Sequence, residues 1–95
     1  MDIESLLQSL NAHKVQYVII GAAAFPAHGY SRPTGDIDIF IRATPKNAQR
    51  TVDAITSAGY DIMNLQVEDF LRKKILFRQY AQDVDIHPTI KGATF

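Results

Sequence analysis

The sequence of 95 residues contains no cysteine and carries no net charge at neutral pH. Without cysteine, the chain can form neither a disulfide-stapled scaffold nor a cysteine-ligated zinc site. Ten basic residues balance ten acidic ones, so broad electrostatic capture of nucleic acid is not expected. Any recognition of phosphate groups must therefore be local.

Long hydrophobic runs are also missing. The most apolar stretch, residues 18–27, is too short to cross a bilayer and is interrupted by Gly21 and Pro26. The N-terminus has no basic region followed by an apolar core, which a secretory signal would show. No repeat, low-complexity segment or linker divides the chain. We therefore expect one soluble, cytoplasmic domain over residues 1–95, with no membrane attachment.

Hydrophobic periodicity predicts helices alternating with strands. The strongest helix signal is Thr44-Pro45, an N-cap hydroxyl followed by proline at the first helical position. The expected helices cover 3–10, 22–28 and 45–58, and the expected strands cover 16–20, 36–41, 73–80 and 83–87. A single helical turn over 67–71 stays open, and 88–95 shows no pattern. These elements predict a small α/β domain with a mixed sheet of about four strands, helices packed against one face, and a hairpin at its end.

Residues 36–41, with the sequence Asp-Ile-Asp-Ile-Phe-Ile, show the most regular placement of charge in the chain, because acidic and apolar residues alternate there. Because side chains alternate along a strand, the three isoleucines face one way, while Asp36, Asp38 and Phe40 face the other. The two carboxylates then stand on one face, with Cα atoms about 6.5–7 Å apart. Both can converge on divalent cations of the Mg²⁺ type. The segment therefore predicts a metal-carboxylate site, although a solvated strand face is the plainer alternative.

The strand expected at 83–87 repeats this alternation, with Asp83, Asp85 and His87 on one face. A third carboxylate is thus available from a neighbouring strand, and three carboxylates can hold two divalent ions around a phosphorus atom. The pattern alone leaves both Asp83 and Asp85 open as the third ligand. His87 could extend the site, but a lone histidine near a strand end is more often a surface or capping residue.

These residues resemble the nucleotidyltransferase superfamily of DNA polymerase β type, in its small bacterial branches that include abortive-infection toxins. The resemblance rests on a strand entering Gly21-Ala22, on residues 27–38, which read Ala-His-Gly-Tyr-Ser-Arg-Pro-Thr-Gly-Asp-Ile-Asp, and on Val84-Asp85-Ile86. In that family a glycine-containing turn precedes a short helix, and an Arg-x-Thr-x-Asp-x-Asp segment supplies two metal ligands. A later strand supplies the third carboxylate. The match covers most of the chain.

The resemblance implies transfer of a nucleoside monophosphate from a nucleoside triphosphate to an acceptor hydroxyl, with release of pyrophosphate and with Mg²⁺ or Mn²⁺ as cofactor. Asp36 and Asp38 would hold both metal ions, and Asp85 would hold the catalytic one. The triphosphate would be bound by Gly21, Ala22, Arg32 and Thr34. The acceptor stays open among a protein, an RNA and a small molecule, and a protein partner or a homodimer is compatible with so small a domain.

Two departures from the family pattern keep a second function open. Many active members carry a glycine-glycine or glycine-serine pair where this chain has Gly21-Ala22, and alanine offers no hydroxyl to a phosphate. Relatives also usually continue past the third carboxylate with helices that cover the nucleotide or bind the acceptor, whereas this sequence ends at Phe95. The alternative is a catalytically weak or inactive binding module, such as one component of a toxin–antitoxin pair.

One dense basic segment follows the helical turn, and its members could guide a nucleic-acid or nucleotide acceptor. A charge run is more often a solvated face, and no aromatic residues suited to base stacking are interleaved with it. The segment consists of Arg72, Lys73, Lys74 and Arg78.

Overall fold

The computed structural model describes residues 3–20, 37–78, 83–90 and 92–95. Within these residues the helices are α1 (Ile3–Ala12), α2 (Pro45–Ser57) and α3 (Asp69–Arg72), and the strands are β1 (Tyr17–Ile20), β2 (Ile37–Ile41), β3 (Ile75–Phe77) and β4 (Val84–His87). The turn left open at 67–71 thus forms as α3. The helix expected at 22–28 lies outside the described residues. None of the described helices combines the length and the apolar character that a bilayer crossing requires.

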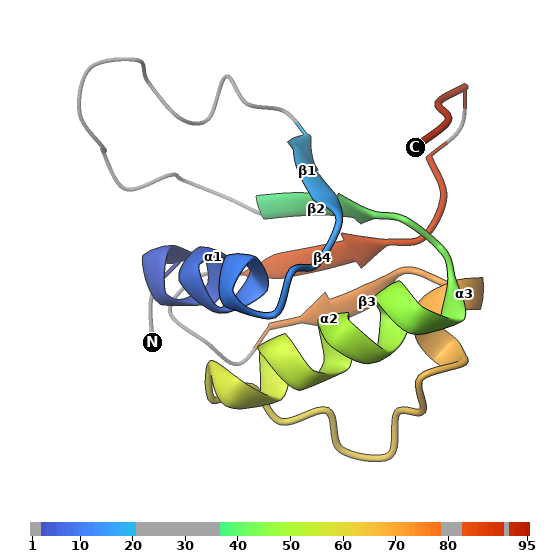
Figure 1. Ribbon diagram of the computed structural model, residues 1–95. Coiled ribbons are helices and arrows are strands. Elements are labelled where there is room, and N and C mark those ends of the chain that lie inside the picture. The colour runs from blue at the N-terminus through green and yellow to red at the C-terminus, as the bar shows by residue number, and fades with distance from the viewer. Residues whose placement is uncertain (1–2, 21–36, 79–82, 91) are drawn as a thin grey trace, which may run out of the picture.

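The four described strands form one mixed sheet in the order β1-β2-β4-β3 (Figure 1). β2 and β4 are parallel neighbours at the centre, and β1 and β3 pair antiparallel at the two edges. The expected mixed sheet and the antiparallel pairing expected for the terminal hairpin are both confirmed. Of the strand predicted at 73–80, residues 75–77 form β3, residues 73, 74 and 78 are not part of it, and residues 79–80 lie outside the described part of the chain. The central pairing places the two acidic segments of the sequence side by side.

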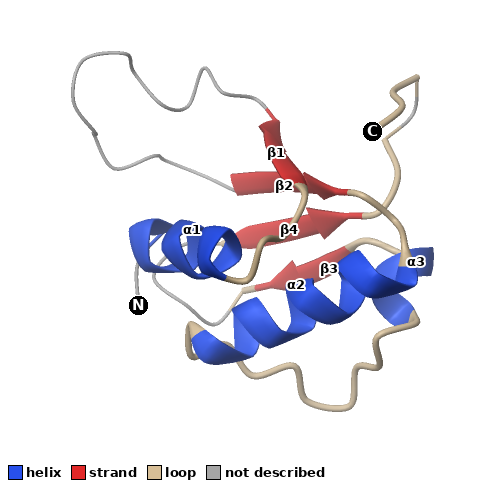
Figure 2. Ribbon diagram, viewed as in Figure 1, coloured by secondary structure: helices blue, strands red, loops and turns tan. Residues whose placement is uncertain are grey.

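Helices α1 and α2 lie together on one face of this sheet (Figure 2). The hydroxyl of Ser9 in α1 donates a hydrogen bond of 2.7 Å to the carbonyl of Ala54 in α2, which joins the two helices directly. Their apolar sides and the isoleucines of β2 form one core. Its most deeply buried members in these three elements are Ile3, Leu6, Leu10, Ile37, Ile39, Ile41, Ala48, Ala54 and Ile55. The alternation predicted for residues 36–41 is therefore confirmed for its apolar face.

The opposite face of β2 is only partly polar. Phe40 is 7% exposed, because Phe95 packs against it edge to face with ring centroids 5.4 Å apart. The guanidinium of Arg42 lies 5.9 Å from the centre of the Phe95 ring, a distance suited to a cation–π contact. The C-terminal segment that showed no pattern in the sequence therefore folds back over the end of β2.

Asn47 fixes the first turn of α2 to the sheet. Its side chain is almost completely buried, and its Oδ1 accepts a hydrogen bond of 2.7 Å from the backbone N–H of Gln16. Its Nδ2 donates to the carbonyls of Gln16, at 3.0 Å, and Arg42, at 2.9 Å. The amide oxygen and both amide N–H groups of Asn47 are therefore hydrogen-bonded, which offsets the cost of burying a polar side chain. Asn47 thus ties the residue before β1 and the residue after β2 to the helix layer.

Thr44 caps α2 as predicted, since its hydroxyl accepts a hydrogen bond of 3.2 Å from the backbone N–H of Asn47. We expect Thr44→Ala to lower the free energy of unfolding by about 1 kcal/mol, because one helix-terminal N–H loses its partner. Urea denaturation followed by circular dichroism measures this loss. Thr44→Ser retains the acceptor oxygen and should retain most of the stability, and an equal loss in both variants would show that capping is not the cause.

Candidate metal centre

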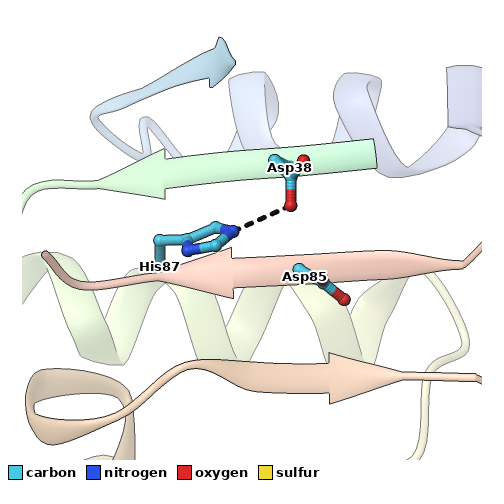
Figure 3. A group of neighbouring side chains, drawn as sticks. All are labelled: Asp38, Asp85 and His87. Carbon is cyan, nitrogen blue, oxygen red and sulfur yellow. Dashed lines mark hydrogen bonds and ion pairs between the residues drawn. The ribbon is translucent and has the colours of Figure 1, made fainter. Parts of the chain in front are cut away.

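Strands β2 and β4 bring Asp38, Asp85 and His87 together on the sheet face away from the helices. Asp38 lies opposite Asp85 in the parallel register, and His87 is two residues further along β4. One potential ligand atom from each of the three side chains lies within 4.8 Å of the other two. Figure 3 shows the three side chains over the strands, with the helices behind them.

Asp38 and His87 are in direct contact across the two strands. The Nε2 atom of His87 lies 2.9 Å from Oδ1 of Asp38, which is a hydrogen bond (Figure 3). The His87 side chain is 15% exposed and that of Asp38 is 39% exposed. The imidazole is therefore largely enclosed, whereas the Asp38 carboxylate keeps one side open to solvent.

Asp85 is the buried carboxylate of the cluster, with 5% of its surface exposed. Its Oδ1 forms an ion pair of 2.6 Å with Nη1 of Arg78, the residue that follows β3. In Figure 3 the Asp85 side chain is turned toward β3. An ionised carboxylate at such low exposure is very costly without a positive partner, and Arg78 supplies that charge.

The structure brings together two of the carboxylates predicted for the site, Asp38 and Asp85. Of the two alternatives for the third carboxylate, Asp85 belongs to the cluster. Asp83 is not one of its members among the described residues, and the Asp83 carbonyl accepts a hydrogen bond of 2.9 Å from the N–H of Ile37. The remaining predicted site residues lie outside the described part of the chain, so their roles stay predictions. They are Gly21, Ala22, Arg32, Thr34 and Asp36.

Two members of the site go beyond the residues that the sequence predicts for it. The sequence leaves His87 open between an extension of the site and a surface or capping residue, and in the structure it is largely enclosed and contacts Asp38. Its period-two spacing from Asp85 was the available signal. Arg78 was grouped with a basic run, but it pairs with Asp85, whereas the rest of that run, Arg72, Lys73 and Lys74, is exposed as a solvated face would be. The pairing of Arg78 with Asp85 depends on the register of the β3-β4 pair. Leu76 lies opposite Asp85, and Arg78, two residues further on, is on the same side of the chain as Leu76.

A cleft of about 530 Å³ lies beside this ion pair. Its walls come from β3 and from the loop at residues 61–65, and they include Leu76, Lys73 and Arg78. Arg78 thus borders the cleft and contacts Asp85 as well. The cleft is large enough for a ligand of small-molecule size, but Asp38, Asp85 and His87 are not among the residues that line it.

Two carboxylates and one imidazole at these separations form a donor set suited to a divalent cation. The chemistry of the donors therefore fits a divalent cation, with an imidazole nitrogen beside the carboxylates. Comparisons with protein-family models, with curated proteins and with solved structures found no match.

Proposed function

We propose that this chain is a metal-dependent nucleotidyltransferase domain, which transfers a nucleoside monophosphate from a nucleoside triphosphate to an acceptor hydroxyl and releases pyrophosphate. The observation that carries the proposal is the juxtaposition of Asp38 and Asp85 on the parallel strands β2 and β4. It sets the second carboxylate of the Asp-x-Asp segment beside a carboxylate from a later strand. That is the arrangement implied by the resemblance to the DNA polymerase β type superfamily.

In this mechanism Asp38 and Asp85, together with Asp36, would hold Mg²⁺ or Mn²⁺. Such ions, when bound, neutralise phosphate charge and increase the acidity of the acceptor hydroxyl. The partly open Asp38 carboxylate would face the substrate, while the buried Asp85 carboxylate would form the floor of the site. Arg32 and Thr34 would bind the triphosphate, and the backbone at Gly21-Ala22 would lie against it.

One observation favours a second candidate, a catalytically weak or inactive binding module. The ion pair of 2.6 Å engages Asp85 with Arg78, so the carboxylate already has a cationic partner within the chain. Together with Ala22, which offers no hydroxyl to a phosphate, this pairing is what a domain retained for binding would show. Such a domain would act as one component of a larger assembly, for example a toxin–antitoxin pair.

Pyrophosphate release separates the two candidates. The protein is incubated with each of the four labelled ribonucleoside triphosphates in Mg²⁺ or Mn²⁺, with a total RNA pool, with the protein itself or with small polyols as acceptors. We expect release in at least one combination and complete loss of release in EDTA. Calorimetric binding of a metal-nucleotide complex without release would support the binding module instead. Absence of both release and binding would contradict both candidates.

A further inference from the structure

His87 is the member of the cluster that a carboxylate-only magnesium site does not require. We propose that His87 is a metal ligand and that it makes the site selective for a first-row transition-metal dication, such as Mn²⁺ or Zn²⁺, over Mg²⁺. The inference rests on the proposed function in one respect only, namely that Asp38 and Asp85 are metal ligands. It does not require that nucleotidyl transfer takes place.

The spacing of the donor atoms supports His87 as a ligand. Nitrogen and oxygen ligands lie about 2.1 Å from such an ion, so two adjacent ligands are about 3.0 Å apart in octahedral coordination and about 3.4 Å apart in tetrahedral coordination. Nε2 of His87 and Oδ1 of Asp38 are 2.9 Å apart. The two side chains therefore already lie close to the separation of adjacent ligands. Binding of the ion would replace their hydrogen bond, and the proton between Nε2 and Oδ1 would be released to solvent.

Asp85 can complete the set with a small side-chain movement. In octahedral coordination, ligands on opposite sides of an ion at this bond length are about 4.2 Å apart. All three potential ligand atoms lie within 4.8 Å of one another, so Asp85 has less than about 1 Å to close for an octahedral ion and up to about 1.5 Å for a tetrahedral one. A rotation of its side chain away from Arg78 would supply this shift.

The imidazole decides which ion the site prefers. Mg²⁺ selects oxygen ligands and retains several waters, whereas imidazole suits transition-metal ions, and carboxylates suit Mn²⁺ as well. A site with two carboxylates and one imidazole therefore matches Mn²⁺ and Zn²⁺ better than Mg²⁺. The His87 side chain is only 15% exposed and is hydrogen-bonded to Asp38, so its ring is held in place before the ion arrives. This restraint limits the conformational entropy that is lost when the ion binds.

Metal titrations of the full chain, without a polyhistidine tag, test the proposal. Calorimetry with MnCl₂, ZnCl₂ and MgCl₂ compares the wild type with His87→Gln and with His13→Gln, a matched control at the end of α1 where the ring contacts the Ser9 carbonyl. We expect the wild type to bind Mn²⁺ at least about tenfold more tightly than Mg²⁺. His87→Gln should weaken Mn²⁺ and Zn²⁺ about tenfold or more and Mg²⁺ less than about threefold, whereas His13→Gln should change none of them.

Pulsed electron paramagnetic resonance of bound Mn²⁺ gives a readout that is independent of affinity. Nitrogen-14 modulation should be present in the wild type and in His13→Gln and absent in His87→Gln. Should His87→Gln not fold, His87→Asp provides the second test, since an oxygen ligand in place of nitrogen should abolish the modulation and reduce the preference for Mn²⁺ over Mg²⁺. Modulation that persists in these variants would overturn the proposal, as would an equal loss of all three ions in His87→Gln, which is the result expected if His87 only orients Asp38.

The inference and the proposed function fail separately. Nitrogen ligation of Mn²⁺ without pyrophosphate release under any condition would refute the enzyme and leave His87 as a ligand. Pyrophosphate release with Mn²⁺ bound but without nitrogen modulation would support the enzyme and refute the role of His87.

Discussion

Replacing Asp38 with asparagine is expected to reduce metal-dependent pyrophosphate release by at least about 100-fold, while the protein keeps its fold. The amide has the shape of the carboxylate and can still accept a hydrogen bond from His87, but it carries no charge for a metal ion. Because Asp38 is 39% exposed, losing its charge should change the free energy of unfolding little in metal-free buffer. Initial rates at saturating triphosphate, together with urea denaturation in EDTA, measure the two effects.

Two further variants make this test specific. Asp53→Asn removes the same charge from the exposed surface of α2 and should leave the rate unchanged. Asp85→Asn should abolish the activity and also destabilise the protein, because the buried side chain at position 85 loses its charge and with it the ion pair with Arg78. Pyrophosphate release by Asp38→Asn at the rate of the Asp53→Asn control would show that the cluster is not a catalytic metal site.

Replacing Asn47 with alanine should lower the free energy of unfolding by about 3 kcal/mol or more. The change removes three hydrogen bonds at a site that is 2% exposed. The N–H of Gln16 loses its acceptor, whereas the carbonyls of Gln16 and Arg42 still accept hydrogen bonds from the backbone N–H groups of Arg42 and Thr44. Each lost hydrogen bond costs about 0.5–1.5 kcal/mol, and a donor left unsatisfied costs about 1–3 kcal/mol. A domain of this size has a total stability of about 5–15 kcal/mol, so the variant should unfold at a much lower urea concentration.

Equilibrium unfolding in urea, followed by circular dichroism, measures this effect. Asn64→Ala is the matched control, because Asn64 is exposed, and such a surface change is expected to alter stability by no more than about 0.5 kcal/mol. Asn47→Asp keeps the acceptor for the N–H of Gln16 but loses both amide donors, and it should also be strongly destabilised. A loss below about 1 kcal/mol for Asn47→Ala would mean that the three hydrogen bonds do not hold the helix to the sheet.

The features that the sequence predicted correctly are those encoded by local patterns. Alternation along residues 36–41 indicated the buried isoleucines and the outward Asp38, and the same alternation indicated Asp85. Thr44-Pro45 predicted the start of α2 because capping and the fixed proline backbone act within one helical turn. Strand alternation and helix capping involve residues only a few positions apart, so both can be recognised from the sequence alone.

The features that were missed depend on contacts between residues far apart in the chain. His87 and Asp38 are separated by 49 positions, and the contact follows from the parallel alignment of β2 with β4, which no local pattern specifies. Phe95 covers Phe40 for the same kind of reason, since an aromatic residue in an unpatterned segment gives no sign of what it will pack against. Nothing in the sequence around Asn47 distinguishes it from an exposed helix residue, because its role depends on hydrogen bonds to Gln16 and Arg42 that form only in the folded chain.

The parallel alignment of β2 and β4 also has a consequence for folding kinetics. The β3-β4 hairpin and the helices close short loops, whereas β2 and β4 must close a loop of more than 40 residues, at a greater cost in chain entropy. We expect this pairing to form late during folding and to separate early during unfolding. A cation held between the two strands would then lengthen the lifetime of the native state by slowing unfolding, with little effect on the folding rate.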